Sequence, residues 1–331
     1  MVATLTNLLT SSSTPGQMRP FDVRRDLTPV ADLVEQCFAD TLDPDGERYL
    51  EQMRAASRNP GFLQFAAVAS EWSSVPLSGY VWEEDGKVVG NISLIPFALR
   101  KQRNYLIANV ATHPAYRRRG IARSLTAQAI EHARRRGAPS TWLHVRQENE
   151  AAINLYLSLN FVERARRTTW YSQAGKPLGE PPGDFTFGPR RPQFWHSQIA
   201  WLKQAYPPQL TWHLPLRLAA LRPGLGGALY RFFTTVFLTQ WAVQRENQML
   251  GVVAWQSAQS YADILWLAIP PHADESAVYA LLMYARQRIP SHRPLSIDYP
   301  AGQSDQAIRS AGFSSHQTLI WMSVEFPKKG W

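Results

Sequence analysis

A short run of arginines and a glycine carries the most specific chemistry in this 331-residue chain. The apolar stretch that ends at Pro114 is followed by Arg117-Arg118-Arg119-Gly120-Ile121-Ala122, after which the pattern becomes helical. This order of strand, loop and helix places the loop at a helix N-terminus, where unbonded backbone N–H groups and the helix dipole attract anions. Gly120 lets the backbone approach a ligand, and the arginines add charge-assisted hydrogen bonds. The spacing therefore predicts a pyrophosphate cradle, although the chain lacks both the Walker pattern and GxGxxG.

A second block of sequence lies about 30 residues after this loop. It runs from Asn149 to Tyr156 and closes with Asn160-Phe161. Together the two blocks resemble the GNAT acetyltransferases, whose acyl-CoA loop has the pattern Q/R-x-x-G-x-G/A and whose later helix follows N-x-x-A-x-x-L-Y-x-x-x-G-F. Asn160 stands where the family usually has glycine, which is a mild change because asparagine also adopts the left-handed conformation at helix ends. The resemblance covers about residues 18–172.

The resemblance implies that acetyl-CoA is the cofactor and assigns residues to its parts. Backbone groups of Val110 and Ala111 would lie along the pantetheine arm in the manner of an added strand. Backbone N–H groups of residues 118–122 would hold the pyrophosphate, and the hydroxyl of Ser124 would add a further hydrogen bond. Asn149 is either the N-cap of its helix or a partner of the cofactor.

By the same resemblance, Tyr156 is the candidate catalytic residue. Its phenol would act as the general acid that protonates the departing thiolate, and a tyrosine that merely packs in the core is the alternative. No general base stands out, because Glu83, Glu84 and His113 are each possible and water molecules are a further alternative. Asn109 and His113 lie on or beside the cofactor strand. We therefore assign neither a base nor a metal ligand.

Hydrophobic spacing predicts a mixed α/β sheet around these residues. A strand over residues 21–24 would precede a helix over 29–40 that is capped by Thr28, with Cys37 as a small core residue. The further predicted elements are a helix at 46–57, strands at 80–82 and 88–97 around the Asp85-Gly86 turn, a strand at 106–111, a helix at 121–136, a strand at 141–145, a helix at 150–159 and a strand at 167–171.

The length of the chain predicts two domains. A hydrophobic content of 45% with twelve tryptophans provides for packed cores, and a single cysteine fits a reducing, cytoplasmic location. We expect a flexible tail over residues 1–17, an acetyl-CoA-binding domain over 18–172, a linker rich in proline and glycine over 173–192, and a second domain over 193–331.

The second half of the chain resembles a degenerate copy of the first. The aligned positions are 85–90 with 246–251, Pro114 with Pro271, Ala133 with Ala285 and Leu143 with Leu295. The offset falls from 157 at the prolines to 152 in the next helix, so the copy has lost five residues where the phosphate loop would be. Asn149 and Tyr156 become Ala301 and Ile308. We therefore expect two GNAT-like domains in tandem, with the chemistry in the N-terminal one.

These features predict an acetyl-CoA-dependent N-acetyltransferase that acts by direct attack of a primary amine on a small molecule or a peptide. A non-catalytic acyl-CoA-binding regulator would tolerate loss of Tyr156, and an aminoacyl transferase of the tandem type would need no intact loop 117–122. In the second half, Trp241, Trp255, Trp266 and Tyr261 either pack in the core or line the acceptor site.

The net charge of +9 gives no clear partner by itself. No motif supports a nucleic-acid partner. The longest apolar stretch, residues 227–243, contains Arg231 and Gln240 and is interpreted as a helix end and a buried strand, so we expect no membrane contact.

Overall fold

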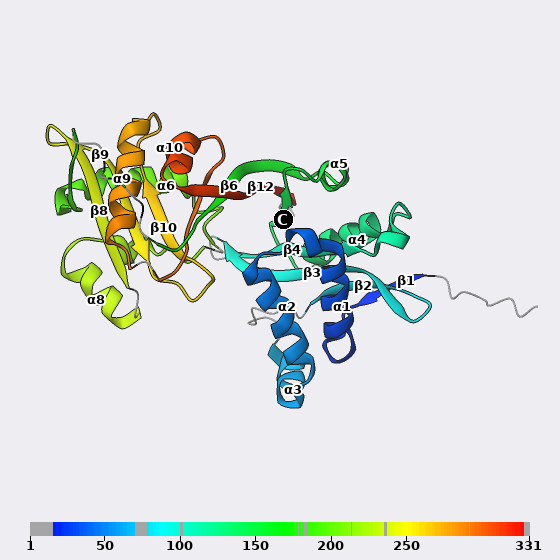
Figure 1. The fold of residues 1–331 in the computed structure, drawn as a ribbon. Coiled ribbons are helices and arrows are strands. Elements are labelled where there is room, and N and C mark those ends of the chain that lie inside the picture. Colours follow the sequence, from blue (N-terminus) through cyan, green and yellow to red (C-terminus); the bar gives the residue numbers. More distant parts are fainter. Residues whose placement is uncertain are drawn as a thin grey trace, which may run out of the picture. The chain divides into compact units, whose positions relative to one another are not determined.

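The computed structural model describes residues 16–69, 78–99, 102–175, 177, 179, 181, 184–212, 214–234, 237–290 and 292–327, so nearly all of the predicted tail lies outside the described residues. The chain divides into two compact units. The first unit consists of Met1–Phe97, Arg103–Trp142 and Glu325–Trp331, and the second consists of Ala98–Gln102 and Leu143–Val324. Figure 1 shows the course of the chain.

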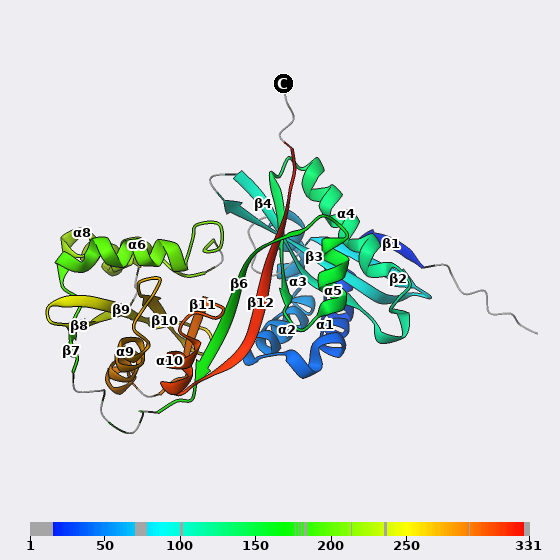
Figure 2. The same ribbon diagram turned by 90° about the horizontal axis from the view of Figure 1, so that it is seen from above.

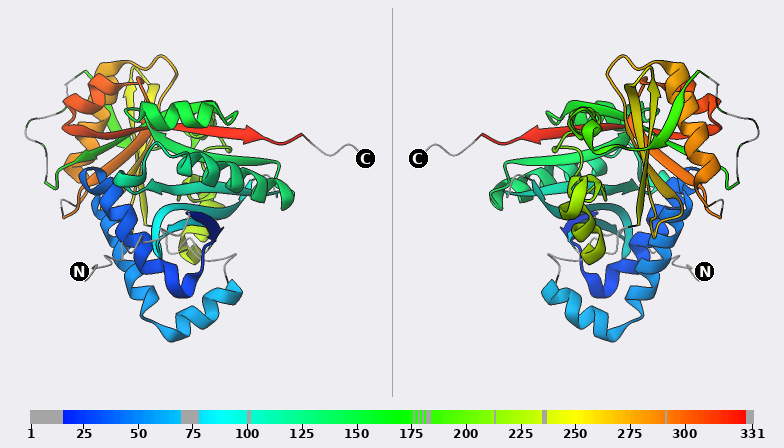
Figure 3. Two further views of the ribbon diagram at one scale, coloured as in Figure 1. Left: turned by 90° about the vertical axis from the view of Figure 1, so that its right-hand side faces the viewer. Right: turned by 90° about the vertical axis from the view of Figure 1, so that its left-hand side faces the viewer.

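The first unit is a sheet with helices on both faces. Its elements are β1 (Gln17–Pro20), α1 (Val23–Phe38), the short 3-10 helix η1 (Ala39–Thr41), α2 (Pro44–Ser57), α3 (Pro60–Ala69), β2 (Gly79–Glu84), β3 (Lys87–Leu99), β4 (Gln102–Thr112), η2 (Pro114–Tyr116) and α4 (Ile121–Arg135). The strands follow the order β1-β2-β3-β4. Buried residues of α1 and α2 pack with Val81 and Ala111, whereas Gly90 faces Ile121 and Leu125 of α4 (Figure 3).

The predicted strand and helix boundary near the start of the chain are wrong. Residues 21–24 are not a strand, because α1 begins at Val23 and the carboxylate of Asp22 caps it by accepting the N–H of Arg24 at 2.9 Å. The first strand is β1, in which Arg19 pairs with Val81. Pro29 lies inside α1, so it does not mark the helix start that the Thr28-Pro29 pair suggested. A local cap at Asp22 therefore decided the boundary.

Most other predicted elements of the first half are confirmed. The hairpin between β2 and β3 turns at Asp85 and Gly86, whose φ angles of 49° and 73° are both positive, as the favoured two-residue turn requires. The helix that follows the phosphate loop begins at Ile121 as predicted. Cys37 is half-buried in the first unit, and its thiol donates to the carbonyl of Thr112, which agrees with a packing role.

The strands of the second unit follow the order β5-β12-β6-β11-β10-β9-β8-β7. Its elements are β5 (Ser140–Arg146, the first three residues of which belong to the first unit), α5 (Glu150–Leu157), β6 (Val162–Ser172), β7 (Thr186–Pro189), η3 (Pro192–Phe194), α6 (Trp195–Ala205), α7 (Leu218–Leu221), α8 (Gly224–Thr234), β8 (Leu238–Arg245), β9 (Gln248–Gln256), β10 (Asp263–Ala268), α9 (Glu275–Arg288), β11 (Leu295–Pro300), α10 (Asp305–Ser310) and β12 (Phe313–Glu325).

The C-terminal strand β12 pairs along most of its length with β6 (Figure 2). This pairing draws the segment from Leu143 to β6 into the second unit, so the compact units differ from the predicted ranges 18–172 and 193–331. The strand β7 also lies inside the predicted linker 173–192, because residues 186–189 pair with β8.

The internal repeat is visible in the order of elements. The series β8-β9-β10-α9-β11-α10-β12 repeats the series β2-β3-β4-α4-β5-α5-β6. The β8–β9 hairpin turns at Glu246 and Asn247, whose φ angles of 47° and 69° match those of the first hairpin. Asn160 before β6 and Gly312 before β12 also share the left-handed conformation, with φ of 66° and 80°. The predicted alignment of the two halves is therefore confirmed at its turns.

Trp241 and Trp266 are buried in the hydrophobic core of the second unit, which favours the packing interpretation for both. Trp255 is partly buried and donates its indole N–H to Asp263, while Tyr261 contacts the ring of Tyr171 edge to face. Among the residues that the structure describes, no helix combines the length and the hydropathy needed to cross a bilayer.

Candidate active site

The loop between β4 and α4 presents unbonded backbone N–H groups. Arg118 and Gly120 both have left-handed backbone conformations, with φ of 67° and 80°. Gly120 is the N-cap of α4 and supplies no side chain to cap it, and the first hydrogen bond of the helix runs from the N–H of Ser124 to the carbonyl of Gly120. The N–H groups of residues 121–123 therefore have no partner within the helix, which is the arrangement that binds phosphate groups.

The space beside Gly120 is open. A Cβ built on Gly120 would have no atom within 4 Å, so a ligand can approach the backbone there. Arg119 pairs with Glu84 at 2.9 Å and lies over the ring of Tyr116, and the Arg117 Nε donates to the carbonyl of Thr112 at 3.4 Å. Arg118 is exposed and makes no hydrogen bond or ion pair within the described part of the chain. The loop thus fits the pyrophosphate of a nucleotide-containing cofactor.

The strand β4 is interrupted just before the two residues predicted to lie along the cofactor. Asn109 has a left-handed φ of 50° in the middle of the strand. Its carbonyl accepts the Asn91 amide at 2.8 Å, and its own amide donates to the Tyr49 hydroxyl at 3.1 Å. Burial raises the pKa of Tyr49 to about 12, although the bond from Asn109 opposes the shift. This kink changes the course of the backbone at Val110, and sequence reasoning missed both its geometry and Tyr49.

The second block of site residues lies on α5, in the second unit. The Asn149 carboxamide oxygen accepts the N–H of Ala152 at 3.1 Å, so Asn149 is the N-cap of this helix. Tyr156 is only 5% exposed, and its ring meets Phe161 edge to face with centroids 5.9 Å apart. Burial raises the pKa of Tyr156 well above its ordinary value, so the phenol keeps its proton at neutral pH.

In the second half, side chains of the protein bond to the helix N-terminus and the strand position that correspond to those described above. Asp274 caps α9 by accepting the N–H groups of Ser276 and Ala277 at 2.9 and 3.3 Å. Leu267, which aligns with Val110 at the offset of 157, donates its backbone N–H to the hydroxyl of the buried Tyr206 at 3.3 Å. Within the second unit, both the helix N-terminus and the equivalent strand position are therefore already bonded.

Comparison with known proteins agrees with this geometry. Residues 34–161 match the family model described as "Acetyltransferase (GNAT) family". Residues 34–161 therefore form a domain of the GNAT acetyltransferase family. The matched residues contain the kinked strand β4, the whole phosphate-binding loop and the α5 tyrosine, so the GNAT match covers every predicted site residue.

Curated relatives of the chain are named acetyltransferases. The [ribosomal protein bS18]-alanine N-acetyltransferase of Escherichia coli is 43% identical over 63 residues, which are 19% of this chain and 43% of the relative. The mycothiol acetyltransferase of Thermomonospora curvata is 29% identical over 151 residues, which are 45% of this chain and 44% of the relative. The chain thus spans less than half the length of these relatives.

The likeness of fold extends further than the likeness of sequence. A GCN5-related N-acetyltransferase from Sphaerobacter thermophilus matches with a TM-score of 0.57 and 14% identity, over 94% of this chain and 95% of that chain. Proteins of the GNAT family use acetyl-CoA, and the open N-terminus of α4 suits the pyrophosphate of this cofactor.

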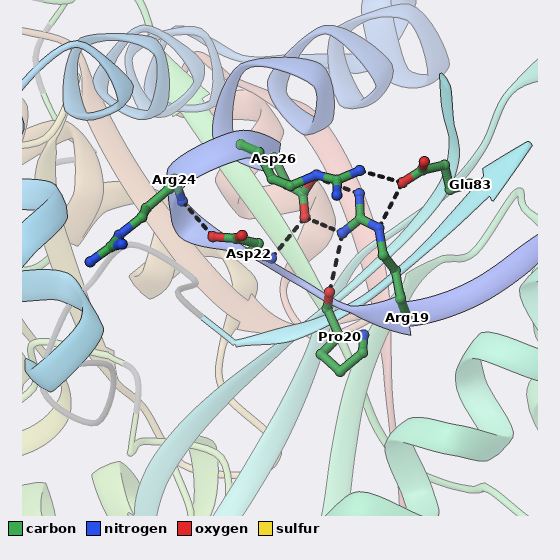
Figure 4. Close-up of polar contacts among 7 residues, drawn as sticks. Arg19, Pro20, Asp22, Arg24, Asp26 and Glu83 are labelled. Atoms are coloured by element: carbon green, nitrogen blue, oxygen red, sulfur yellow. Dashed lines mark hydrogen bonds and ion pairs between the residues drawn. The ribbon is translucent and has the colours of Figure 1, made fainter. Parts of the chain in front are cut away.

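In this GNAT domain, Glu83 is not free to act as a base. Its carboxylate pairs with Arg19 at 2.7 Å and with Arg25 at 2.5 Å, and Arg19 also binds Asp26 through two hydrogen bonds (Figure 4). Glu83 therefore links β2 to β1 and α1 through these ion pairs.

The other two candidate bases are engaged as well. Glu84 pairs with Arg119 of the phosphate loop. The Nδ1 of His113 accepts the backbone N–H of Ala115 at 3.2 Å, so the proton of the neutral ring is placed on Nε2 and no second lone pair remains. The described residues thus leave none of the three predicted bases free.

A cavity of about 520 Å³ lies in the same unit between α1 and the β2–β3 hairpin. Its volume would suit a small molecule. Two of its cations, Arg19 and Arg25, are already paired with Asp26 and Glu83, so we assign it no ligand. Its lining residues are Arg19, Arg25, Asp26, Pro29, Asp32, Leu33, Gln36, Gly86, Lys87, Val88 and His113.

Proposed function

We propose that the protein is an acetyl-CoA-dependent N-acetyltransferase whose N-terminal half carries the activity. The observation that carries this proposal is the N-terminus of α4, which has no side-chain cap and has open space beside Gly120. Acetyl-CoA would supply an acetyl thioester, and the amine nitrogen of the acceptor would form the new amide bond as the thiolate leaves.

The contrast between the two halves supports this assignment. The N-terminus of α4 keeps its N–H groups available, whereas Asp274 satisfies those of α9. A carboxylate at that position would also repel a phosphate group. The acidic cap and the bond between Tyr206 and Leu267 argue against a second acetyl-CoA site.

The chain's own residues would divide the work as follows. The N–H groups of residues 118–122 and the side chain of Arg118 bind the pyrophosphate, with Ser124 one turn into α4. The backbone of Val110 and Ala111, beyond the kink at Asn109, binds the pantetheine arm.

The remaining role belongs to α5. Tyr156 donates the proton to the leaving thiolate, for which its raised pKa keeps it in the protonated form. Asn149 fixes the first turn of the helix that carries Tyr156. With the three predicted bases engaged, we assign removal of the amine proton to water.

The acceptor is proposed as a primary amine of a small molecule or a peptide. One relative is named for the alanine of a ribosomal protein and the other for mycothiol. These two names span a protein amine and a small molecule, so they support the amine class and no single acceptor.

Calorimetric titration of acetyl-CoA into the wild type and a Gly120→Glu variant tests the proposal. The glutamate would fill the open space and repel the pyrophosphate, so binding should be lost. Gly137→Glu is a matched control, because Gly137 follows the other end of α4 with a φ of 72° and equally open surroundings. A glutamate has the same backbone strain at either position, so the two variants differ in that only Gly120→Glu changes the proposed pyrophosphate site.

The two variants separate a lost site from a lost fold. Binding by the wild type and by Gly137→Glu, with none by Gly120→Glu, supports the cradle. Equal affinity in all three proteins would place acetyl-CoA elsewhere, and the absence of binding to the wild type would overturn the proposed activity.

A further inference from the structure

One face of α8 exposes a row of large apolar side chains to solvent. Leu225, Leu229, Phe232 and Phe233 are 90%, 59%, 79% and 74% exposed. Their spacing of four, three and one residues places them on one side of the helix. Phe237, just beyond the helix, is 68% exposed and extends the same apolar character. We call the four helical residues the α8 stripe; α8 lies on the outside of the second unit (Figure 1).

The α8 stripe cannot rotate toward the core, because the opposite side of α8 is held by contacts with neighbouring residues. Gly227 is buried, and a Cβ there would lie 1.9 Å from the carbonyl oxygen of Arg222. The Arg231 guanidinium donates to the carbonyl of Ala220 at 2.7 Å, which ties the helix to α7. Rotating α8 to bury Phe232 would break this bond and move Gly227 out of its close contact. The exposure is therefore built into the local packing.

All the Asp, Glu, Lys and Arg positions in the sequence around the stripe are basic residues. Residues 185–245 contain no aspartate or glutamate, and they contain seven lysines and arginines. Of these, Arg222 is exposed in the short connection between α7 and α8, and Arg217 is exposed at the N-cap of α7. The seven basic residues are Arg190, Arg191, Lys203, Arg217, Arg222, Arg231 and Arg245. A run of this composition beside an apolar face is typical of a helix that meets an anionic surface.

We propose that the α8 stripe docks this protein on the surface of an anionic lipid bilayer. The leucines and phenylalanines would enter the boundary between headgroups and acyl chains, while Arg217 and Arg222 would pair with lipid phosphates. This is adsorption and not insertion across the bilayer, since α8 has only 11 residues. The proposal departs from the sequence-based expectation of no membrane contact, because exposure of the stripe is a property of the fold.

Two features favour lipid over a protein partner. Three of the four side chains of the α8 stripe are more than two thirds exposed, and together they form a ridge, which a fluid lipid phase can accommodate without a preformed groove. A second copy of the chain would bring another basic surface against this one, and both copies carry a net charge of +9. Like charges would oppose that pairing.

Sedimentation of the full chain with lipid vesicles tests the proposal. We expect binding to vesicles of POPC with about one third POPG, and little binding to POPC alone, because both the stripe and the arginines are needed. Phe232→Ser with Phe233→Ser should weaken binding roughly tenfold or more, since two apolar side chains leave the lipid. Each of Arg217→Gln and Arg222→Gln should weaken binding about fivefold.

A matched control is available on the same unit. Leu157→Ser with Val162→Ser also removes two exposed apolar side chains, which are 51% and 53% exposed, but leaves the stripe intact and should bind as the wild type does. Equal loss in both double variants, or equal binding to neutral and anionic vesicles, would overturn the proposal. A dimer that the Phe232 and Phe233 changes dissociate, without any vesicle binding, would assign the stripe to a second copy instead.

Discussion

The hydroxyl of Tyr206 accepts the backbone N–H of Leu267 at 3.3 Å, in the strand that aligns with the proposed cofactor strand of the first half. Tyr206 comes from the end of α6, and burial raises its pKa well above the ordinary value. A side chain of the protein thus bonds to the backbone position that corresponds to the proposed pantetheine site of the first half. We infer that this contact seals the second half against an acyl carrier.

The first prediction follows from this seal. We expect calorimetry to show one acetyl-CoA bound per chain, because the second half has both Tyr206 and the Asp274 cap in place. Asp274→Ser should leave this stoichiometry unchanged, since Tyr206 still bonds to Leu267. Two equivalent sites in the wild type would contradict the assignment of the cofactor to the N-terminal half.

The second prediction concerns the general acid. Tyr156→Phe should lower kcat by about 10²–10⁴-fold, while the affinity for acetyl-CoA stays within about twofold, because only the proton donor is removed. The matched control is Tyr171→Phe, which changes a tyrosine of β6 that contacts Tyr261 and His316. Steady-state kinetics together with calorimetry separate the two effects. Full turnover by Tyr156→Phe would assign the proton to another donor.

The third prediction concerns a buried ion pair in the second unit. The Arg167 side chain is almost fully buried; it pairs with Asp298 and donates to the carbonyl of Ala205 at 2.7 Å. Arg167→Met should lower the free energy of unfolding by about 3 kcal/mol, because it leaves the partly buried Asp298 carboxylate without its partner. Arg167→Met combined with Asp298→Leu should cost less than Arg167→Met alone. Chemical denaturation measures both, and a double variant less stable than the single one would show that the carboxylate itself is needed.

Local patterns were enough to predict the backbone of the loop before α4 and the hairpin turns. Gly120 and the Asp85-Gly86 pair are left-handed as their residue types suggest, and the helix begins at Ile121. Backbone conformations of this kind are determined by neighbouring residues, so a single sequence is enough to predict them. The alignment of the two halves succeeded for the same reason, because Asn247 and Gly312 mark turns in both the sequence and the fold.

Contacts between distant segments could not be predicted. Asn109 is kinked because Asn91 and Tyr49 hold it from β3 and α2, and no local pattern identifies those partners. Tyr206 is more than 60 residues from Leu267 in the chain. The sequence also showed an apolar stretch over residues 227–243, but not that large side chains of α8 are left exposed. The sequence left three candidate bases open, and it could not show their partners, among them Arg19 and Arg119, because these partners are brought to them by the fold.

The last prediction concerns alkaline pH and Tyr49. Its pKa of about 12 in the folded protein exceeds the ordinary value near 10 because burial disfavours the phenolate. The unfolded chain therefore loses this proton first as the pH rises. The contribution of Tyr49 to stability is complete below pH 10 and is lost between pH 10 and about 12, by about 3 kcal/mol at most.

Tyr49→Phe isolates this contribution from those of other buried tyrosines. Tyr156, Tyr206 and Tyr299 also have raised pKa values, so the wild type and the variant should both lose stability above pH 10. The variant should be less stable at pH 8, because it lacks the bond from Asn109, and its loss between pH 10 and 12 should be smaller. Urea denaturation at a series of pH values measures both slopes. Parallel curves for the two proteins would mean that the Tyr49 proton is not linked to folding.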